Sequence, residues 1–182
     1  MAEVDHITLG GGCFWCTEAA FLELRGVQSV EPGYAGGHDP SPTYESVCSG
    51  RTGHAEVVRV AFDPEVLPLD ALLHVFFTVH DPTTRDRQGA DVGTQYRSIV
   101  LYQDEEQEQV VRSVMAKLEA EGLWPHPFVT EVAPLTRFFP AEPYHVDYYR
   151  RNAGQPYCQV VISPKLAKVR REFAHRIRGD ST

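Results

Sequence analysis

The chain has 182 residues and a formal net charge of −8, from 17 Lys and Arg against 25 Asp and Glu. This length predicts a single domain, residues 1–182, with one hydrophobic core. The acidic balance argues against nucleic acid as a partner, because phosphate binding requires clustered Lys and Arg. The exception is a basic run from Lys165 to Arg178, which we interpret as the solvated face of a helix.

The sequence also limits the location of the protein. No apolar run is long enough to cross a bilayer, and the N-terminus lacks the basic-then-apolar order of a signal peptide. We therefore expect a cytoplasmic protein with no membrane association. In a reducing compartment, catalytic or redox chemistry explains four cysteines better than structural disulfides do.

Strands and helices alternate along the first half of the chain. We expect, in order, a strand at residues 4–9, a helix at about 13–24, a strand at 27–34, a loop at 36–42, a strand at 54–62 and a helix from Pro68 to about residue 79. In the third of these strands, Glu56 shares one face with Val58 and Phe62, and the residues between them point the other way.

The second half begins with a long irregular segment at 81–95, a length that is often functional. We then expect a strand at 96–102, a helix capped by Asp104 and Gln107 and ended by Gly122, a strand near 128–133, a short helix near 142–151 and a last helix from Ser163. Strands mixed with helices throughout predict an α/β or α+β domain around a mixed sheet.

The stretch GGGCFWCTE places two thiols one turn apart at the predicted start of a helix. Helix N-termini carry unpaired N–H groups and partial positive charge, so we expect Cys13 to have a lowered pKa and to act as a nucleophile. The preceding glycines allow a sharp turn and close approach to a ligand. The simpler alternative is a buried cysteine in a core helix.

Cys16 completes a Cys-x-x-Cys pattern, which indicates redox chemistry at the start of a helix. A zinc site would require a second pair of ligands, but Cys48 and Cys158 stand alone. The glycines also lack the spacing of a phosphate or dinucleotide loop. We therefore expect no metal and no bound cofactor.

Three further residues suit a thiol nucleophile. Phe14 and Trp15 could form an apolar wall for a small group such as a methyl on sulfur, which contacts aromatic rings favourably. Glu56 starts at the edge of an apolar strand face, where desolvation raises the pKa of a carboxyl and makes it a general acid. The alternative for Glu56 is a glutamate at the rim of a strand end.

The chain resembles the A-type peptide methionine sulfoxide reductases over nearly its whole length. The motifs that carry the resemblance are, in order, GGCFW at 11–15, GYAGG at 33–37, GHAE at 53–56, HDPTT at 80–84 and GTQYRS at 93–98. The resemblance implies a two-layer α/β sandwich with a mixed sheet and much coil. One departure is Cys16, where many relatives carry Gly.

The resemblance also implies the roles of the site residues. These are Cys13 as nucleophile, Phe14 and Trp15 as the methyl pocket, Tyr34, Tyr96 and Glu56 as contacts of the sulfoxide oxygen, with Asp91 and His54 binding the rest of the substrate.

We therefore expect reduction of the S-epimer of methionine sulfoxide, free or in oxidised proteins. Cys13 would become a sulfenic acid, then a disulfide, and thioredoxin would restore the dithiol. Two alternatives remain: a general dithiol-disulfide oxidoreductase that uses Cys13 and Cys16, and a module that binds methionine-rich segments without catalysis.

Two thiols compete to resolve the sulfenic acid. Cys158 lies in GQPYCQ, a segment expected to be mobile and similar to the resolving GYC position of the family. Cys16 is nearer in sequence, but Phe14 and Trp15 lie between it and Cys13. The sequence favours a Cys13–Cys158 disulfide, with Cys16 as the alternative.

Overall fold

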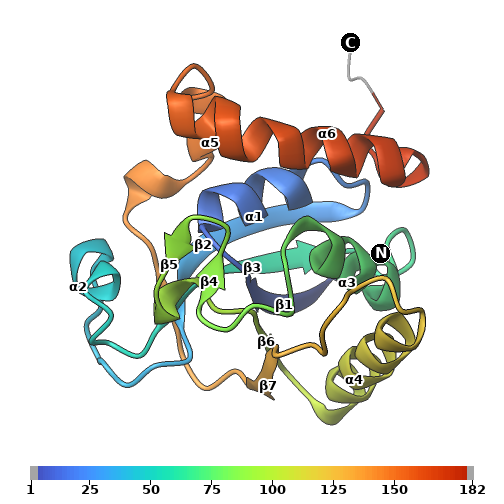
Figure 1. Cartoon of the computed structure of the whole chain (residues 1–182), viewed down its shortest axis with the longest axis horizontal. Helices are drawn as coiled ribbons and strands as arrows, with labels where there is room; N and C mark the ends of the chain where they lie inside the picture. Colours follow the sequence, from blue (N-terminus) through green and yellow to red (C-terminus); the bar gives the residue numbers. More distant parts are fainter. Residues whose placement is uncertain (1–3, 180–182) are drawn as a thin grey trace.

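A mixed six-stranded sheet forms the centre of the computed structural model, which describes residues 4–179 (Figure 1). Across the sheet, its strands are β7 (Glu131–Pro134), β6 (Ile99–Tyr102), β1 (Asp5–Gly10), β3 (Ala55–Phe62), β2 (Val27–Ala35) and β8 (Phe138–Pro140). Neighbouring strands are antiparallel, except that β6 and β7 are parallel.

Helices cover one face of this sheet, and coil covers the other. The longer helices are α1 (Phe14–Leu22), α3 (Leu69–Val79), α4 (Glu105–Ala120) and α6 (Ser163–Glu172). Val58 and Val60 of β3 point into the core that these helices close, whereas Val57 joins a smaller cluster packed by Leu135 and Phe138. The predicted two-layer α/β sandwich is confirmed.

Local sequence explains where the helices begin and end. Pro68 precedes α3, and the side chain of Asp104 accepts a hydrogen bond from the backbone N–H of Gln107 at 2.9 Å at the start of α4. Gly122 follows α4 with a positive φ of 70°, the conformation that favours glycine at a helix end. The side chain of Gln107 accepts a hydrogen bond from the backbone N–H of Gln103. A capping box would instead use the N–H of Asp104, the next residue.

Short elements fill the remaining chain. They are α2 (Tyr44–Cys48), β4 (Arg87–Gln88), β5 (Asp91–Val92), α5 (Tyr148–Arg151), the 3-10 turns η1 (Thr94–Tyr96), η2 (Pro143–His145) and η4 (Ala174–Arg176), and a π-helical turn, η3 (Cys158–Ile162). No helix within residues 4–179 combines the length and apolarity needed to cross a membrane.

Two expectations about these segments were wrong. Tyr96 lies in η1, so the following strand starts only at Ile99. The expected helix at 142–151 is interrupted at Asp147, whose φ of 54° cannot continue a helix. The segment around Cys158 is a helical turn that continues into α6, and Cys158 has 0% exposed surface, while the expected mobility of this segment stays a prediction.

Candidate active site

The glycine turn before α1 is packed tightly against its neighbours. A Cβ atom on Gly11 would lie 2.6 Å from the ring of His80, and Gly12 has a φ of 83°. His80 is fixed because Nδ1–H donates to the carbonyl of Phe76 at 2.6 Å and Nε2 accepts from the Ser98 hydroxyl at 2.7 Å. The backbone of Gly11 therefore lies close to the His80 ring, whereas the sequence suggested close approach to a ligand. This packing fixes the start of α1.

Cys13 is the N-cap residue of α1 and is 7% exposed. Burial raises the pKa of its thiol well above the usual range, and the hydrogen bond to Cys16 and the charge of Glu56 act in the same direction. The expected lowered pKa was therefore wrong for Cys13, because desolvation outweighs the helix terminus. The hydrogen bond from Cys13 instead lowers the pKa of Cys16.

Glu56 lies beside Cys13 on the neighbouring strand β3 and is 1% exposed. Its Oε1 accepts a hydrogen bond from Phe14 N–H at 3.1 Å, which ties the carboxyl to the first turn of α1. Burial raises the pKa of Glu56 to about 8, as the sequence predicts, although the Phe14 N–H partly opposes this shift. The other oxygen, Oε2, is buried without a hydrogen-bond partner among the described residues.

Three tyrosines surround this carboxyl. Tyr34 pairs with Glu56 across β2 and β3, and Tyr96 lies in η1, where its carbonyl accepts from Gly12 N–H at 3.1 Å. Burial, and next to it the charge of Glu56, raise the pKa values of Tyr44 and Tyr96, so both hydroxyls keep their protons at neutral pH. Sequence reasoning missed Tyr44, which no recognised motif contains.

Glu142 holds two of these tyrosines, and it was also missed. Its Oε1 accepts from the Tyr34 hydroxyl at 2.7 Å, and its Oε2 accepts from Tyr44 N–H at 2.8 Å. Partial burial works against ionisation, but these hydrogen bonds outweigh it and lower the pKa of Glu142. In this state the Tyr34 hydroxyl is therefore directed to Glu142.

The two rings of the predicted aromatic wall lie in different settings. Phe14 is 1% exposed and packs behind the site, 5.7 Å from the ring of Tyr34. Trp15 is half-buried and lies flat against Tyr148, with centroids 3.7 Å apart and an angle of 7°. Its Nε1–H donates to Nδ1 of His145 at 3.0 Å, so residues far along the chain fix the exposed ring.

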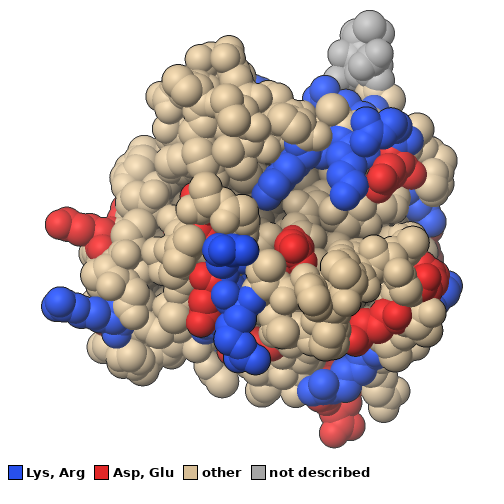
Figure 2. All heavy atoms as spheres, viewed as in Figure 1, with Lys and Arg blue, Asp and Glu red and all other residues tan. Residues whose placement is uncertain are grey.

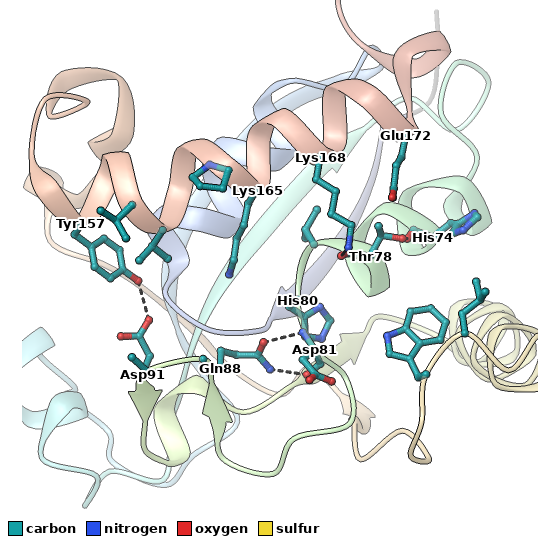
Figure 3. Close-up of a pocket in the computed structure, with 18 residues that line it drawn as sticks. His74, Thr78, His80, Asp81, Gln88, Asp91, Tyr157, Lys165, Lys168 and Glu172 are labelled. Carbon is teal, nitrogen blue, oxygen red and sulfur yellow. Dashed lines mark hydrogen bonds between the residues drawn. The ribbon is translucent and has the colours of Figure 1, made fainter.

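Asp91 approaches the site from β5. Its Oδ2 accepts a hydrogen bond from the hydroxyl of Tyr157 at 2.7 Å, and the Tyr157 oxygen lies 4.0 Å from Sγ of Cys16 (Figure 3). The structure thus brings Asp91 close to Cys16, and its expected role in binding the substrate stays a prediction. Tyr157 precedes Cys158 in the sequence, but nothing in the sequence pattern indicated this contact.

His54 does not reach the site, contrary to expectation. Nδ1 accepts from Gly37 N–H at 3.0 Å, so Nε2 carries the hydrogen and donates to the carbonyl of Asp39 at 2.8 Å. The ring is 2% exposed and packs edge-on against Phe139. Both nitrogens are used by the loop after β2, so His54 supports that loop and has no atom free for a substrate.

Cys158 is fully buried at the start of η3. Burial raises the pKa of the Cys158 thiol, and the charge of Cys16 raises it further. Within residues 4–179, no group of three or more His, Cys, Asp or Glu side chains is arranged to hold a metal ion.

The surface above the site carries the basic run of the C-terminal part. Lys and Arg side chains gather over α6 at the upper right of Figure 2. Lys165 and Lys168 line a cavity of about 1120 Å³ between α6 and the β4–β5 hairpin, while Arg170 pairs with Glu23 of the loop after α1. The basic helix face is therefore only partly a solvated surface.

Two adjacent thiols, a carboxyl held neutral by burial and an aromatic wall together define a cysteine-dependent redox enzyme. A family model described as peptide methionine sulfoxide reductase matches residues 5–177. A peptide methionine sulfoxide reductase MsrA from Chromobacterium violaceum is 56% identical over 176 residues, which is 97% of this chain and 100% of that protein. The chain therefore belongs to the peptide methionine sulfoxide reductase family, A type.

Solved structures agree with this assignment. Mxr1 from Saccharomyces cerevisiae in its reduced form has a TM-score of 0.79 and 35% identity, covering 86% of this chain and 90% of that one. The same yeast protein in complex with Trx2, a thioredoxin, matches with a TM-score of 0.56 and 25% identity, covering 80% and 85%.

Proposed function

We propose that this enzyme reduces the S-epimer of methionine sulfoxide to methionine, in oxidised proteins or free. The observation that carries the proposal is the Glu56 carboxyl: its pKa of about 8 keeps it protonated at neutral pH, and its free oxygen is buried beside Cys13. A sulfoxide is a weak electrophile until its oxygen receives a proton. A neutral acid next to a thiol suits that requirement.

In the proposed reaction, the sulfoxide oxygen takes the place opposite the free Oε2 of Glu56. Glu56 gives its proton to that oxygen, and the hydroxyls of Tyr96 and Tyr44 donate hydrogen bonds as charge develops there. Tyr34 can join once its hydroxyl turns from Glu142. Cys13 attacks the activated sulfoxide sulfur as its thiol proton passes to the Glu56 carboxylate, which restores the acid. The S–O bond of the substrate breaks as the oxygen moves to the Cys13 sulfur, so methionine leaves and Cys13 becomes a sulfenic acid.

Shape supports the choice of substrate. With the oxygen directed to Glu56, Trp15 is the exposed apolar surface for the methyl group, and Asp91 lies where the rest of the substrate would extend. The oxygen, the methyl group and the rest of the substrate each have a fixed direction from the sulfur, so the site distinguishes the two epimers. Membership of the A-type family supports the choice of the S-epimer.

We propose that Cys16 is the first thiol to react with the sulfenic acid, because it shares the first turn of α1 with Cys13, whose carbonyl accepts from Cys16 N–H at 3.0 Å. Cys158, favoured by the sequence, would act afterwards by exchange with the Cys13–Cys16 disulfide. Thioredoxin then restores the dithiol, a step supported by the complex of the yeast homologue with Trx2. Such recycling requires a reducing compartment, so the cytoplasmic location remains a prediction.

Turnover of racemic methyl p-tolyl sulfoxide with dithiothreitol tests this function. We expect consumption of one enantiomer only, and a large loss of rate in Glu56→Gln. A general dithiol-disulfide oxidoreductase would leave both enantiomers untouched and would reduce insulin disulfides equally well in wild type and Glu56→Gln. That result would overturn the proposed activity.

A further inference from the structure

Tyr157 connects the second thiol of the site to a carboxylate. Its hydroxyl donates to Asp91 Oδ2 at 2.7 Å, while its oxygen faces Cys16 Sγ at 4.0 Å. In Figure 3 the side chain points from the start of η3 toward Asp91, at one end of the cavity below α6. The ring also packs edge-on against Trp15, with centroids 6.0 Å apart. The hydroxyl is therefore held between a carboxylate and a thiol.

Several titratable groups influence Cys16 from the elements around it. They are Cys13 before α1, Glu56 on β3, Asp91 on β5, Tyr157 and Cys158 at η3, and Lys165 on α6. Cys13 and Tyr157 are the hydrogen-bonding groups of this set, and Lys165 contributes positive charge. When Cys13 is oxidised to a sulfenic acid, its thiol hydrogen is lost as a donor to Cys16. Tyr157 is then the neighbouring hydrogen-bond donor that the oxidation leaves unchanged.

We propose that Tyr157 is the hydrogen-bond donor that makes Cys16 the attacking thiolate of the second half-reaction. In the reduced state the Cys16 S–H faces the Tyr157 oxygen, whose own hydrogen is directed to Asp91. Rotation about the C–O bond moves that hydrogen from Asp91 to the sulfur without moving any heavy atom. This inference rests on the proposed function, in which Cys16 resolves the sulfenic acid.

The step that Tyr157 assists is balanced as follows. Cys16 loses its proton to solvent and attacks the sulfur of the Cys13 sulfenic acid. The new S–S bond forms as the S–O bond breaks, and the departing hydroxide takes up a proton to become water. Cys16 is oxidised, the sulfenic sulfur is reduced to the disulfide level, and no further reactant is needed.

The first test measures Cys16 without any sulfoxide. Reduced wild type and Tyr157→Phe are alkylated with iodoacetamide between pH 5 and 10, and Cys16 modification is quantified by peptide mass spectrometry. We expect the midpoint for Cys16 to rise by about one pH unit in Tyr157→Phe, the order of one lost hydrogen bond to a charged group. Tyr149→Phe is the matched control, because its hydroxyl pairs with Ser163 at 2.7 Å instead.

The second test follows one turnover without reductant. In Tyr157→Phe, disulfide formation should slow about tenfold relative to methionine release at pH 7, corresponding to the one-unit shift. An unchanged pH midpoint, or equal slowing of both steps, would overturn the role of Tyr157. Failure of wild type to release methionine would contradict the proposed function instead, while the alkylation midpoint would still decide whether Tyr157 controls Cys16.

Discussion

The indole N–H of Trp15 donates a hydrogen bond to Nδ1 of His145, a residue 130 positions further along the chain. Since Nδ1 accepts, the ring hydrogen of His145 lies on Nε2, which is buried without a partner among the described residues. Burial lowers the pKa of His145, so its ring stays neutral and remains an acceptor. His145 thereby fixes the orientation of the aromatic wall.

His145→Phe should therefore loosen Trp15 while keeping an aromatic ring in the core. The loss of one neutral hydrogen bond, about 1 kcal/mol, predicts a fall in kcat/KM of about fivefold, mainly through KM. In a Trp124→Phe background, acrylamide should also quench the fluorescence of Trp15 more strongly. Tyr144→Phe is the control, because that exposed side chain packs on His145 without bonding Trp15. Unchanged KM and quenching would contradict this role.

The sequence locates those parts of the site that lie close together along the chain or on one strand. Cys13, Phe14 and Trp15 are consecutive, and the alternation of β3 reveals the buried setting of Glu56. His145 and Tyr157 escape such reasoning, because their contacts depend on how η2 and η3 fold back onto α1. The predicted direction of the Cys13 pKa shift was wrong for a related reason. The sequence shows where the helix starts, but it does not show how deeply that start is buried.

Glu56→Gln keeps the shape of the carboxyl but removes its proton. We expect the sulfoxide reduction step to slow by on the order of 10² to 10⁴ at neutral pH, with substrate binding largely kept. In wild type, Glu56 is the active acid only below its pKa of about 8, so the single-turnover rate should fall as the pH rises through 8. Glu56→Gln should lose this dependence. A change of less than threefold would exclude Glu56 as the acid.

Glu18 provides a separate prediction about stability. It is 2% exposed on α1, its Oε2 accepts from Asp147 N–H at 3.0 Å, and burial raises its pKa to about 7. The folded state therefore holds a proton that the unfolded chain releases near pH 4.5, so this group lowers stability as the pH rises from 4.5 through 7.

Glu18→Gln carries no such penalty. Its free energy of unfolding, relative to wild type, should increase by on the order of 2–3 kcal/mol between pH 4.5 and pH 8. Denaturant titrations at both pH values measure this difference, and Glu45→Gln, an exposed glutamate on α2, is the control. A constant difference across this range would show that the Glu18 pKa is not raised in the folded protein.

The final prediction concerns the first disulfide. The backbone N–H of Cys16 donates to the carbonyl of Cys13 at 3.0 Å, so the two residues are neighbours in the first turn of α1, whereas Cys158 is fully buried in η3. A direct Cys13–Cys158 link requires the buried thiol of Cys158 to become accessible, whereas Cys16 already shares the first turn of α1 with Cys13. Peptide mapping under non-reducing conditions, after one turnover without reductant, should therefore give a dominant Cys13–Cys16 link. In Cys16→Ser, the sulfenic acid should persist long enough for trapping by dimedone, while Cys48→Ser, which alters an exposed thiol on α2, should map as wild type. A dominant Cys13–Cys158 link in wild type would instead show that η3 opens during turnover and that Cys158 resolves the sulfenic acid directly.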